Sequence, residues 1–296
     1  MKQSLFTGAC TALVTPFFHD KVNYPMLQRL IRRQTDADVR ALVLCGTTGE
    51  SPTLSDEEKL EIFRRGKEYA GPDCVILAGT GSNSTTHAVA LSRAAEEAGA
   101  DGLLVVSPYY NKATPEGLTA HFTAVARAVN IPVLLYNVPS RTGVDIPVSV
   151  YRRLAALPNI VGVKEASTDM AKIPAILSAC GPEFRVYSGN DELTLPVIAM
   201  GGDGVISVTA NVAPAAVQAL CRAALEGDRT TAAALQLRLL ELNRLLFTQV
   251  NPIPVKAAMA CIGFDCGACR LPLTPLKSPL FEELKAYLGV EQRDFL

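Results

Sequence analysis

Short apolar segments alternate with amphipathic segments along most of the chain. Eight of the apolar segments are rich in β-branched residues and lack polar alternation, which is typical of parallel strands buried on both faces. They cover residues 9–15, 41–45, 75–78, 102–107, 133–136, 160–163, 185–187 and 205–208. The pattern therefore predicts eight parallel strands.

Helix signals separate these segments. Ser55 and Glu58 have the spacing of a capping box, and Pro115 follows Thr114 at a first helical position. The apolar residues of one helical face then follow: Leu118, Phe122, Val125, Ala126 and Val129. Strand then helix, repeated, predicts an α/β fold, a (β/α)8 TIM barrel, over residues 1–211. A doubly wound sheet is disfavoured, because no G-x-G-x-x-G motif follows the first strand.

The pattern changes to helices alone from about residue 212, so residues 212–296 are predicted to form the last barrel helix and a C-terminal helical extension. A leucine stripe at helical spacing comprises Leu235, Leu239, Leu242, Leu245 and Leu246. Such a stripe favours core packing over a groove for a partner, although association between copies through this region stays open.

Composition excludes several classes of function. The 296 residues carry 28 basic and 29 acidic side chains, so no net positive field attracts nucleic acid or an anionic membrane. With 49% hydrophobic and 19% charged residues, the chain can bury a large core. No apolar run reaches membrane-spanning length, and Pro16 interrupts the first one. Scattered cysteines among apolar neighbours favour a reducing, cytoplasmic location.

Polar residues close several predicted strands, at the end of the barrel where active sites lie. Lys164 directly follows 160–163, so its side chain is expected at the barrel mouth. Partial desolvation there favours a neutral amine that attacks a carbonyl, whereas pairing with Glu165 would make Lys164 structural. Tyr136 closes the neighbouring strand and favours the first alternative, because Schiff-base formation needs a proton shuttle.

Other residues at strand ends suit hydroxyl relays and carboxylate binding. Thr47 and Tyr110 extend the chain of hydroxyls from Tyr136 toward solvent. Backbone N–H groups of the turn at 46–49 are placed to hold one carboxylate, and Arg141 offers a bidentate fork for another. The alternatives are tyrosines that only pack and a surface arginine without a ligand.

In these strand-end residues and their neighbours, the chain resembles the dihydrodipicolinate synthase family over nearly its whole length. The matching stretches are GTTGES at 46–51, PYYN at 108–111, YNVPSRTG at 136–143, GVKEA at 162–166, GVISVTAN at 204–211 and NPIPVK at 251–256. Related pyruvate-dependent aldolases such as N-acetylneuraminate lyase share the barrel, the lysine and the first tyrosine. The stretch 140–143 therefore discriminates between them.

The resemblance implies that Lys164 forms a Schiff base with pyruvate. Thr47, Tyr136 and Tyr110 would relay protons, with Tyr110 supplied by a neighbouring subunit.

Four further residues would bind substrate. Thr48 would hold the pyruvate carboxylate, the carbonyl of Ile206 would face the imine, and Gly189 would line the same site. Arg141 would bind the carboxylate of the second substrate, L-aspartate 4-semialdehyde.

As a family member the chain would be a homotetrameric lyase of the carbon–oxygen class in lysine and diaminopimelate biosynthesis, with no cofactor. Two other functions stay open: a related aldolase with a different aldehyde, and a catalytically silent sensor of keto acids.

Inhibition by L-lysine occurs in some family members, at a site beside Tyr109. Asn83 and Tyr109 are retained here, but histidine positions of the sensitive form hold Asp56 and Lys59, and a glutamate position holds His87. Weak or absent inhibition is therefore expected.

A metal site is not expected from the remaining candidates. Cys261, Cys266 and Cys269 have the C-x4-C-x2-C spacing of ferredoxins, but no fourth cysteine accompanies them, so packed thiols are favoured. The histidines, at positions 19, 87 and 121, lack a zinc-binding spacing.

Overall fold

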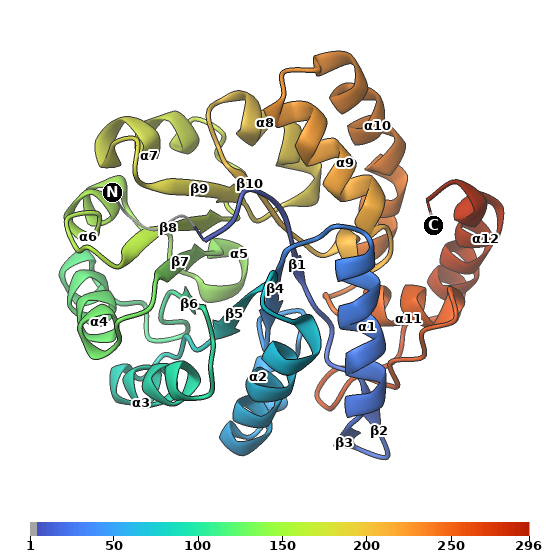
Figure 1. The fold of residues 1–296 in the computed structure, drawn as a ribbon, viewed down its shortest axis with the longest axis horizontal. Helices are drawn as coiled ribbons and strands as arrows, with labels where there is room; N and C mark the ends of the chain where they lie inside the picture. Colours follow the sequence, from blue (N-terminus) through green and yellow to red (C-terminus); the bar gives the residue numbers. More distant parts are fainter. Residues whose placement is uncertain (1–4, 296) are drawn as a thin grey trace.

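A closed barrel of eight parallel strands forms the centre of the computed structural model, which describes the backbone of residues 5–295 and the side chains of residues 5–289. The strand order is β1-β10-β9-β8-β7-β6-β5-β4, and helices surround the strands (Figure 1). The strands are β1 (Gly8–Ala12), β4 (Ala41–Leu44), β5 (Val75–Gly79), β6 (Gly102–Val106), β7 (Val133–Asn137), β8 (Ile160–Glu165), β9 (Arg185–Ser188) and β10 (Gly204–Ser207). The predicted TIM barrel is confirmed.

The strand boundaries differ from the predicted ones at the site. β1 ends at Ala12 rather than at residue 15. Leu13 N still donates to Val43 O of β4, but Val14 N leaves the ladder and donates to Asn211 Oδ1 at 3.1 Å. β8 continues through Lys164 to Glu165. The catalytic candidate Lys164 therefore lies inside a strand rather than after one, and its orientation is fixed by the ladder.

Helices with the predicted signals follow the strands. Ser55 and Glu58 form the capping box of α2, and Thr114 caps α4 by accepting from Gly117 N. The barrel helices are α1 (Tyr24–Asp36), α2 (Asp56–Ala70), α3 (Thr85–Glu97), α4 (Pro115–Ala128), α6 (Val148–Leu154), α7 (Lys172–Cys180), α8 (Thr194–Ala199) and α9 (Pro214–Leu225). Short elements complete the loops: β2 (Phe17–Phe18), β3 (Lys21–Val22), α5 (Pro139–Thr142) and the 3-10 turns η1 (Ser51–Thr53), η2 (Asp191–Leu193) and η3 (Thr209–Asn211).

Two separate cores result from the alternation of side chains along each strand. Inward side chains such as Cys10, Leu134 and Ile206 fill the barrel, and Tyr136 belongs to the same cluster. Outward side chains pack against the helices in a second, larger cluster. A residue on a strand therefore belongs either to the interior of the barrel or to the layer under the helices.

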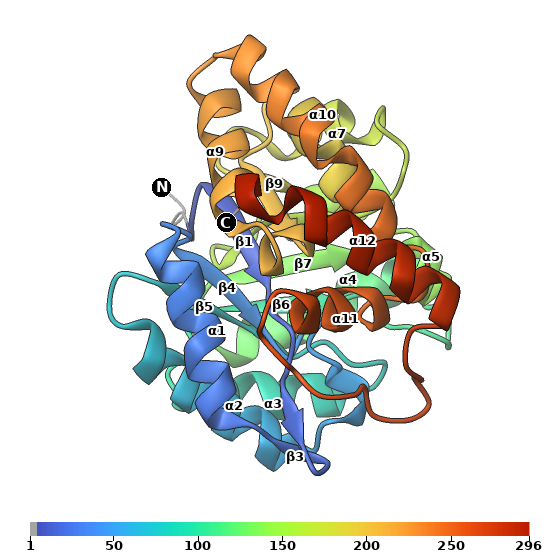
Figure 2. The ribbon, with the colours of Figure 1, turned by 90° about the vertical axis from the view of Figure 1, so that its right-hand side faces the viewer.

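The C-terminal helices α10 (Arg229–Leu246), α11 (Ile253–Cys261) and α12 (Ser278–Phe295) lie outside the ring of barrel helices, and α11 and α12 share one side of the barrel (Figure 2). The leucine stripe packs into the core, as predicted, with Leu239, Leu242, Leu245 and Leu246 buried and Leu235 partly buried. Within the described residues no helix is both long and apolar enough to cross a membrane.

Candidate active site

Lys164 and Tyr136 lie next to each other in the barrel wall. They are register partners in the β7/β8 ladder, and the Lys164 Nζ lies 4.4 Å from the centroid of the Tyr136 ring. Only 5% of Lys164 and 6% of Tyr136 is exposed. Within the described residues Lys164 Nζ makes no hydrogen bond or ion pair. Its neighbour Val163 belongs to the outer cluster and its register partner Tyr136 to the interior one, so the amine faces the barrel interior with a phenol beside it.

Glu165, the alternative partner of Lys164, is engaged elsewhere. Its Oε1 accepts from Asn137 Nδ2 at 2.7 Å and from the backbone N of Ser167 at 2.8 Å. Its Oε2 accepts from the Tyr151 hydroxyl at 3.1 Å and lies 3.6 Å from Lys172 Nζ. Since neighbours along a strand point to opposite faces, Glu165 serves the layer under the helices and does not neutralise Lys164.

The charge of Lys164 acts on two buried groups of the barrel. Burial raises the pKa of Asp191, while hydrogen bonds from Ser207 and nearby backbone N–H groups, followed by the charge of Lys164, oppose that rise. Burial likewise raises the pKa of the Cys10 thiol well above its ordinary value, and Lys164 again opposes the rise. Asp191 accepts from the Ser207 hydroxyl and from Val208 N at 3.0 Å, so it fixes the end of β10 close to the lysine.

Thr47 and Thr48 lie in a tight turn between β4 and η1. Gly49 N donates to Gly46 O at 3.1 Å, and Glu50 N donates to Thr47 O at the same distance. Thr47 lines the cavity described below, whereas Thr48 is buried and its Oγ1 accepts from Asn251 Nδ2 at 3.0 Å. The turn thus directs one hydroxyl to the cavity and anchors the other.

Arg141 belongs to the short helix α5, directly after β7, and its side chain also contacts the segment around Asn251. Arg141 Nη2 donates to Asn251 O at 3.2 Å. Asn251 therefore touches both predicted carboxylate-binding residues, Thr48 through its side chain and Arg141 through its carbonyl. Its own Oδ1 is buried and has no hydrogen-bond partner among the described residues.

Gly189 and Ile206 complete the barrel wall at this end. A Cβ added at Gly189 would lie 2.5 Å from the Ala166 Cβ, a distance that side chains do not tolerate, so only glycine fits between β9 and β8. Ile206 is fully buried in the interior cluster and pairs with Cys10 across the β1/β10 ladder. Both residues lie in the wall of the barrel around Lys164. Gly189 N donates to Glu165 O, next to Lys164 in the chain, at 2.7 Å.

A cavity of about 480 Å³ opens at this end of the barrel. Thr47, Tyr136 and Arg141 line it, so the structure brings these three predicted residues together. Tyr110 is 90% exposed and does not line the cavity of its own chain. Its backbone is held in the left-handed region at φ 74°, which is unusual for a tyrosine.

The same cavity extends to Asp56, Lys59 and His87. Asp56 accepts from Lys59 Nζ at 3.2 Å through Oδ1, and its Oδ2 lies 2.8 Å from His87 Nε2. The pKa of Asp56 is lowered because hydrogen bonds and charge from His87 and Lys59 outweigh its burial. The lining of the cavity therefore includes Tyr136, against which Lys164 packs although Lys164 itself is not a lining residue, and a carboxylate with two basic partners.

Among the described residues no three His, Cys, Asp or Glu side chains gather as metal ligands. Cys266 is buried, its Sγ lies 3.3 Å from Phe264 O, and burial raises the pKa of this thiol to about 12. Burial also raises the pKa of Cys269 to about 11. Burial therefore holds these thiols protonated.

The sequence analysis missed the roles of two residues in stretches that it had matched. Asn251 and Lys256 are both in the 251–256 stretch, and both contact the turn at 46–51 from more than 200 positions away. A lysine within the apolar run 253–258 was the available signal, because lysine is seldom buried unless it is paired.

Comparison with known proteins agrees with an enzyme built on this barrel. The family model described as the dihydrodipicolinate synthetase family matches residues 5–290. A 4-hydroxy-tetrahydrodipicolinate synthase of Acetivibrio thermocellus is 46% identical over 288 residues, 97% of this chain and 98% of that protein. The chain belongs to the dihydrodipicolinate synthetase family.

Solved structures show the same relationship. The crystal structure of dihydrodipicolinate synthase from Aquifex aeolicus matches with a TM-score of 0.95 and 44% identity, covering 97% of this chain and 98% of that chain. A structure described as a monomeric dihydrodipicolinate synthase variant matches with a TM-score of 0.96 and 39% identity, covering 99% and 98%.

Proposed function

We propose that the chain condenses pyruvate with L-aspartate 4-semialdehyde through a Schiff base on Lys164. It is a lyase of lysine and diaminopimelate biosynthesis, with the activity of a 4-hydroxy-tetrahydrodipicolinate synthase. The observation that carries the role of Lys164 is its environment: a buried amine without an acidic partner among the described residues, against the ring of Tyr136.

The reaction begins at the Lys164 amine. The neutral amine attacks C2 of pyruvate, and the carbinolamine loses the former carbonyl oxygen as water to give an imine. Tyr136 delivers and removes the protons that these steps need, with Thr47 next in the relay. Loss of a proton from C3 then gives an enamine, which is the carbon nucleophile.

The second half of the reaction joins the two substrates. The enamine attacks the aldehyde carbon of L-aspartate 4-semialdehyde, whose carboxylate is held by Arg141. The substrate amine then attacks the imine carbon and displaces Lys164, which closes the ring and frees the enzyme.

The remaining positions hold the first substrate. Thr48 binds the pyruvate carboxylate. Gly189 and the Ile206 carbonyl face the imine from the barrel wall. No cofactor takes part in this scheme. Assignment to the carbon–oxygen lyases depends on the water lost from C2 and stays a prediction, as does a cytoplasmic location.

A homotetramer with Tyr110 in the site of a neighbouring subunit is part of the proposal. The support is the 90% exposure of Tyr110 and its absence from the cavity lining of its own chain. The monomeric variant among the related structures makes the oligomeric state worth measuring directly. Sedimentation combined with activity tests it, and a fully active monomer would contradict it.

Borohydride reduction in the presence of pyruvate tests the central step. Peptide mass spectrometry is expected to find the reduced pyruvyl adduct on Lys164 and on no other lysine. Absence of the adduct would exclude both this function and that of a related aldolase. The remaining alternative would then be a protein that binds keto acids without catalysis. With the adduct found, a panel of aldehydes decides the second substrate.

A further inference from the structure

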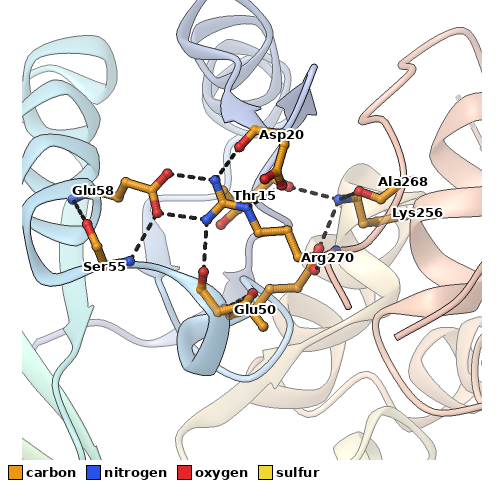
Figure 3. A network of polar contacts seen from close by, with 9 residues as sticks. Thr15, Asp20, Glu50, Ser55, Glu58, Lys256, Ala268 and Arg270 are labelled. Carbon is orange, nitrogen blue, oxygen red and sulfur yellow. Dashed lines mark hydrogen bonds and ion pairs between the residues drawn. The ribbon is translucent and has the colours of Figure 1, made fainter. Parts of the chain in front are cut away.

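A buried ion pair connects the C-terminal extension to the turn that carries Thr47 and Thr48 (Figure 3). Lys256, on α11, lies 2.9 Å from Glu50 Oε1, and the two side chains are 3% and 1% exposed. Glu50 follows the turn directly, so this contact joins parts of the chain that are 206 positions apart.

Lys256 holds more than the carboxylate. Its Nζ also donates to Thr15 O at 3.2 Å and to Ala268 O at 3.1 Å. Thr15 in turn donates from Oγ1 to Gly49 O at 2.7 Å. The ammonium therefore fixes the chain after β1 and the turn after β4 at the same time, and all of its N–H donors have partners.

Glu50 is bound on both sides. Its Oε2 accepts from the backbone N of Arg270 at 2.9 Å, while the Arg270 guanidinium binds both oxygens of Glu58 at 2.7 Å (Figure 3). The Glu50 backbone adopts the left-handed conformation, at φ 57°, which a glutamate takes only when its surroundings hold it there. Both cations contact the ring of Phe17, whose centroid lies 4.5 Å from Lys256 Nζ and 4.3 Å from Arg270 Cζ.

We propose that Lys256 and Glu50 are positioning residues for pyruvate: their buried contact sets the turn at 46–49, so that Thr47 and Thr48 meet the keto acid. Neither side chain touches the substrate. This inference rests on the proposed function, because it assumes that pyruvate binds at this turn.

The surroundings of the pair favour this role over a purely stabilising one. A buried ion pair is weak evidence for stability, because desolvation offsets most of the attraction between its charges. Here the ion pair also binds backbone atoms: Lys256 donates to the carbonyls of Thr15 and Ala268, and Glu50 accepts from the backbone N of Arg270. Thr15 in turn donates to Gly49 O of the turn. Such a network defines one geometry, and small displacements of a binding group have large effects on catalysis.

The test separates pyruvate binding from the later steps. In Lys256→Met and Glu50→Gln enzymes, the KM for pyruvate is expected to rise between about tenfold and a hundredfold. The KM for the aldehyde changes by less than about threefold, because Arg141 is untouched. Half-saturation of borohydride trapping by pyruvate should shift by the same factor as the pyruvate KM.

Lys67→Met is the control, at an ion pair whose side chains are 30% and 32% exposed. Lys67 Nζ lies 2.7 Å from Asp101 Oδ1, and Asp101 Oδ2 accepts from a backbone N–H, that of Ile76, as Glu50 does from Arg270. This pair lies at the amino-terminal end of β5, away from the cavity. The control should lose thermal stability and keep the pyruvate KM of the unaltered enzyme.

Two further variants keep the inference testable if a single charge change prevents folding. The double variant Lys256→Met with Glu50→Gln leaves no unpaired buried charge, and Thr15→Val removes one neutral hydrogen bond to the turn at nearly constant volume. Both should raise the pyruvate KM, Thr15→Val by about threefold.

Folded variants with a pyruvate KM within about twofold of the unaltered enzyme would overturn the positioning role, even if their stability fell. Failure of the unaltered enzyme to form an adduct would instead overturn the proposed function. The two failures are therefore distinguishable.

Discussion

Two lysines at the same end of the barrel are almost equally buried and have opposite surroundings. Lys164 is 5% exposed inside the barrel, where no described residue pairs with its amine. Lys256 is 4% exposed in the layer beside the C-terminal extension, where a carboxylate and two carbonyls take all of its donors. Burial alone therefore does not make a nucleophile. What matters is whether the fold provides partners for the charge.

The largest effect is expected from removing the unpaired amine. Lys164→Ala should lower kcat by at least about a thousandfold, because no other group takes over covalent catalysis. Steady-state rates with both substrates measure this. Lys67→Met, which breaks an ion pair far from the cavity, serves as the control. A Lys164→Ala enzyme with more than a few per cent of normal activity would contradict the role of Lys164 as the nucleophile.

Replacing Arg141 tests whether this residue binds the aldehyde substrate and not pyruvate. Arg141→Ala should lower kcat/KM for L-aspartate 4-semialdehyde by about tenfold or more, since a charged hydrogen bond contributes roughly 1.5–3 kcal/mol. The pyruvate KM should change little. Arg141→Lys restores the charge without the planar fork and should recover only part of the loss. Unchanged aldehyde kinetics in the alanine variant would remove the main reason for preferring this aldehyde.

His121 is a buried basic residue of α4, and only one of its two ring nitrogens has a hydrogen-bond partner among the described residues. Its Nδ1 lies 2.9 Å from Thr85 Oγ1, but its Nε2 has no hydrogen-bond partner in the described residues, and burial lowers its pKa to about 4. In the unfolded chain the pKa is about 6.5, so that state takes up the proton first as the pH falls. Stability is full above about pH 6.5 and is lost toward pH 4.

The expected loss is about 1 to 3 kcal/mol. Melting temperature measured from pH 7 to pH 4 should fall less steeply in His121→Leu than in the unaltered protein. Parallel curves would show that His121 is protonated in the folded state and that the packed layer tolerates its charge.

The smallest effect is expected from L-lysine. At the far end of the cavity Asp56 is already bound by Lys59 and His87, so an incoming ammonium meets two basic groups and a carboxylate with partners. Loss of one charged contact of about 1.5–3 kcal/mol weakens binding roughly ten- to a hundredfold. Initial rates at subsaturating pyruvate are the measurement. Half-inhibition below about a millimolar would contradict this interpretation of the three residues.

The amino-acid sequence by itself determined the barrel and the types of residue at its mouth. Buried parallel strands are apolar along their whole length, and the helix after residue 114 begins at a cap and a proline, so both are encoded within a few neighbouring positions. The pairing of Tyr136 with Lys164 follows nearly as directly, because sequential strands of such a barrel are neighbours.

Only the tertiary structure decided which polar groups have partners. Whether Lys164 meets Glu165 depends on the face of β8 that each occupies. The sequence favoured the Schiff-base lysine because Tyr136 closes the neighbouring strand, but it did not show what Glu165 binds instead. The contacts of Asn251 with Thr48 and of Lys256 with Glu50 form only when the barrel closes and α11 lies across it. The periodicity of a short segment does not predict contacts between residues so far apart in the chain. Their relative position depends on how all the elements between them pack.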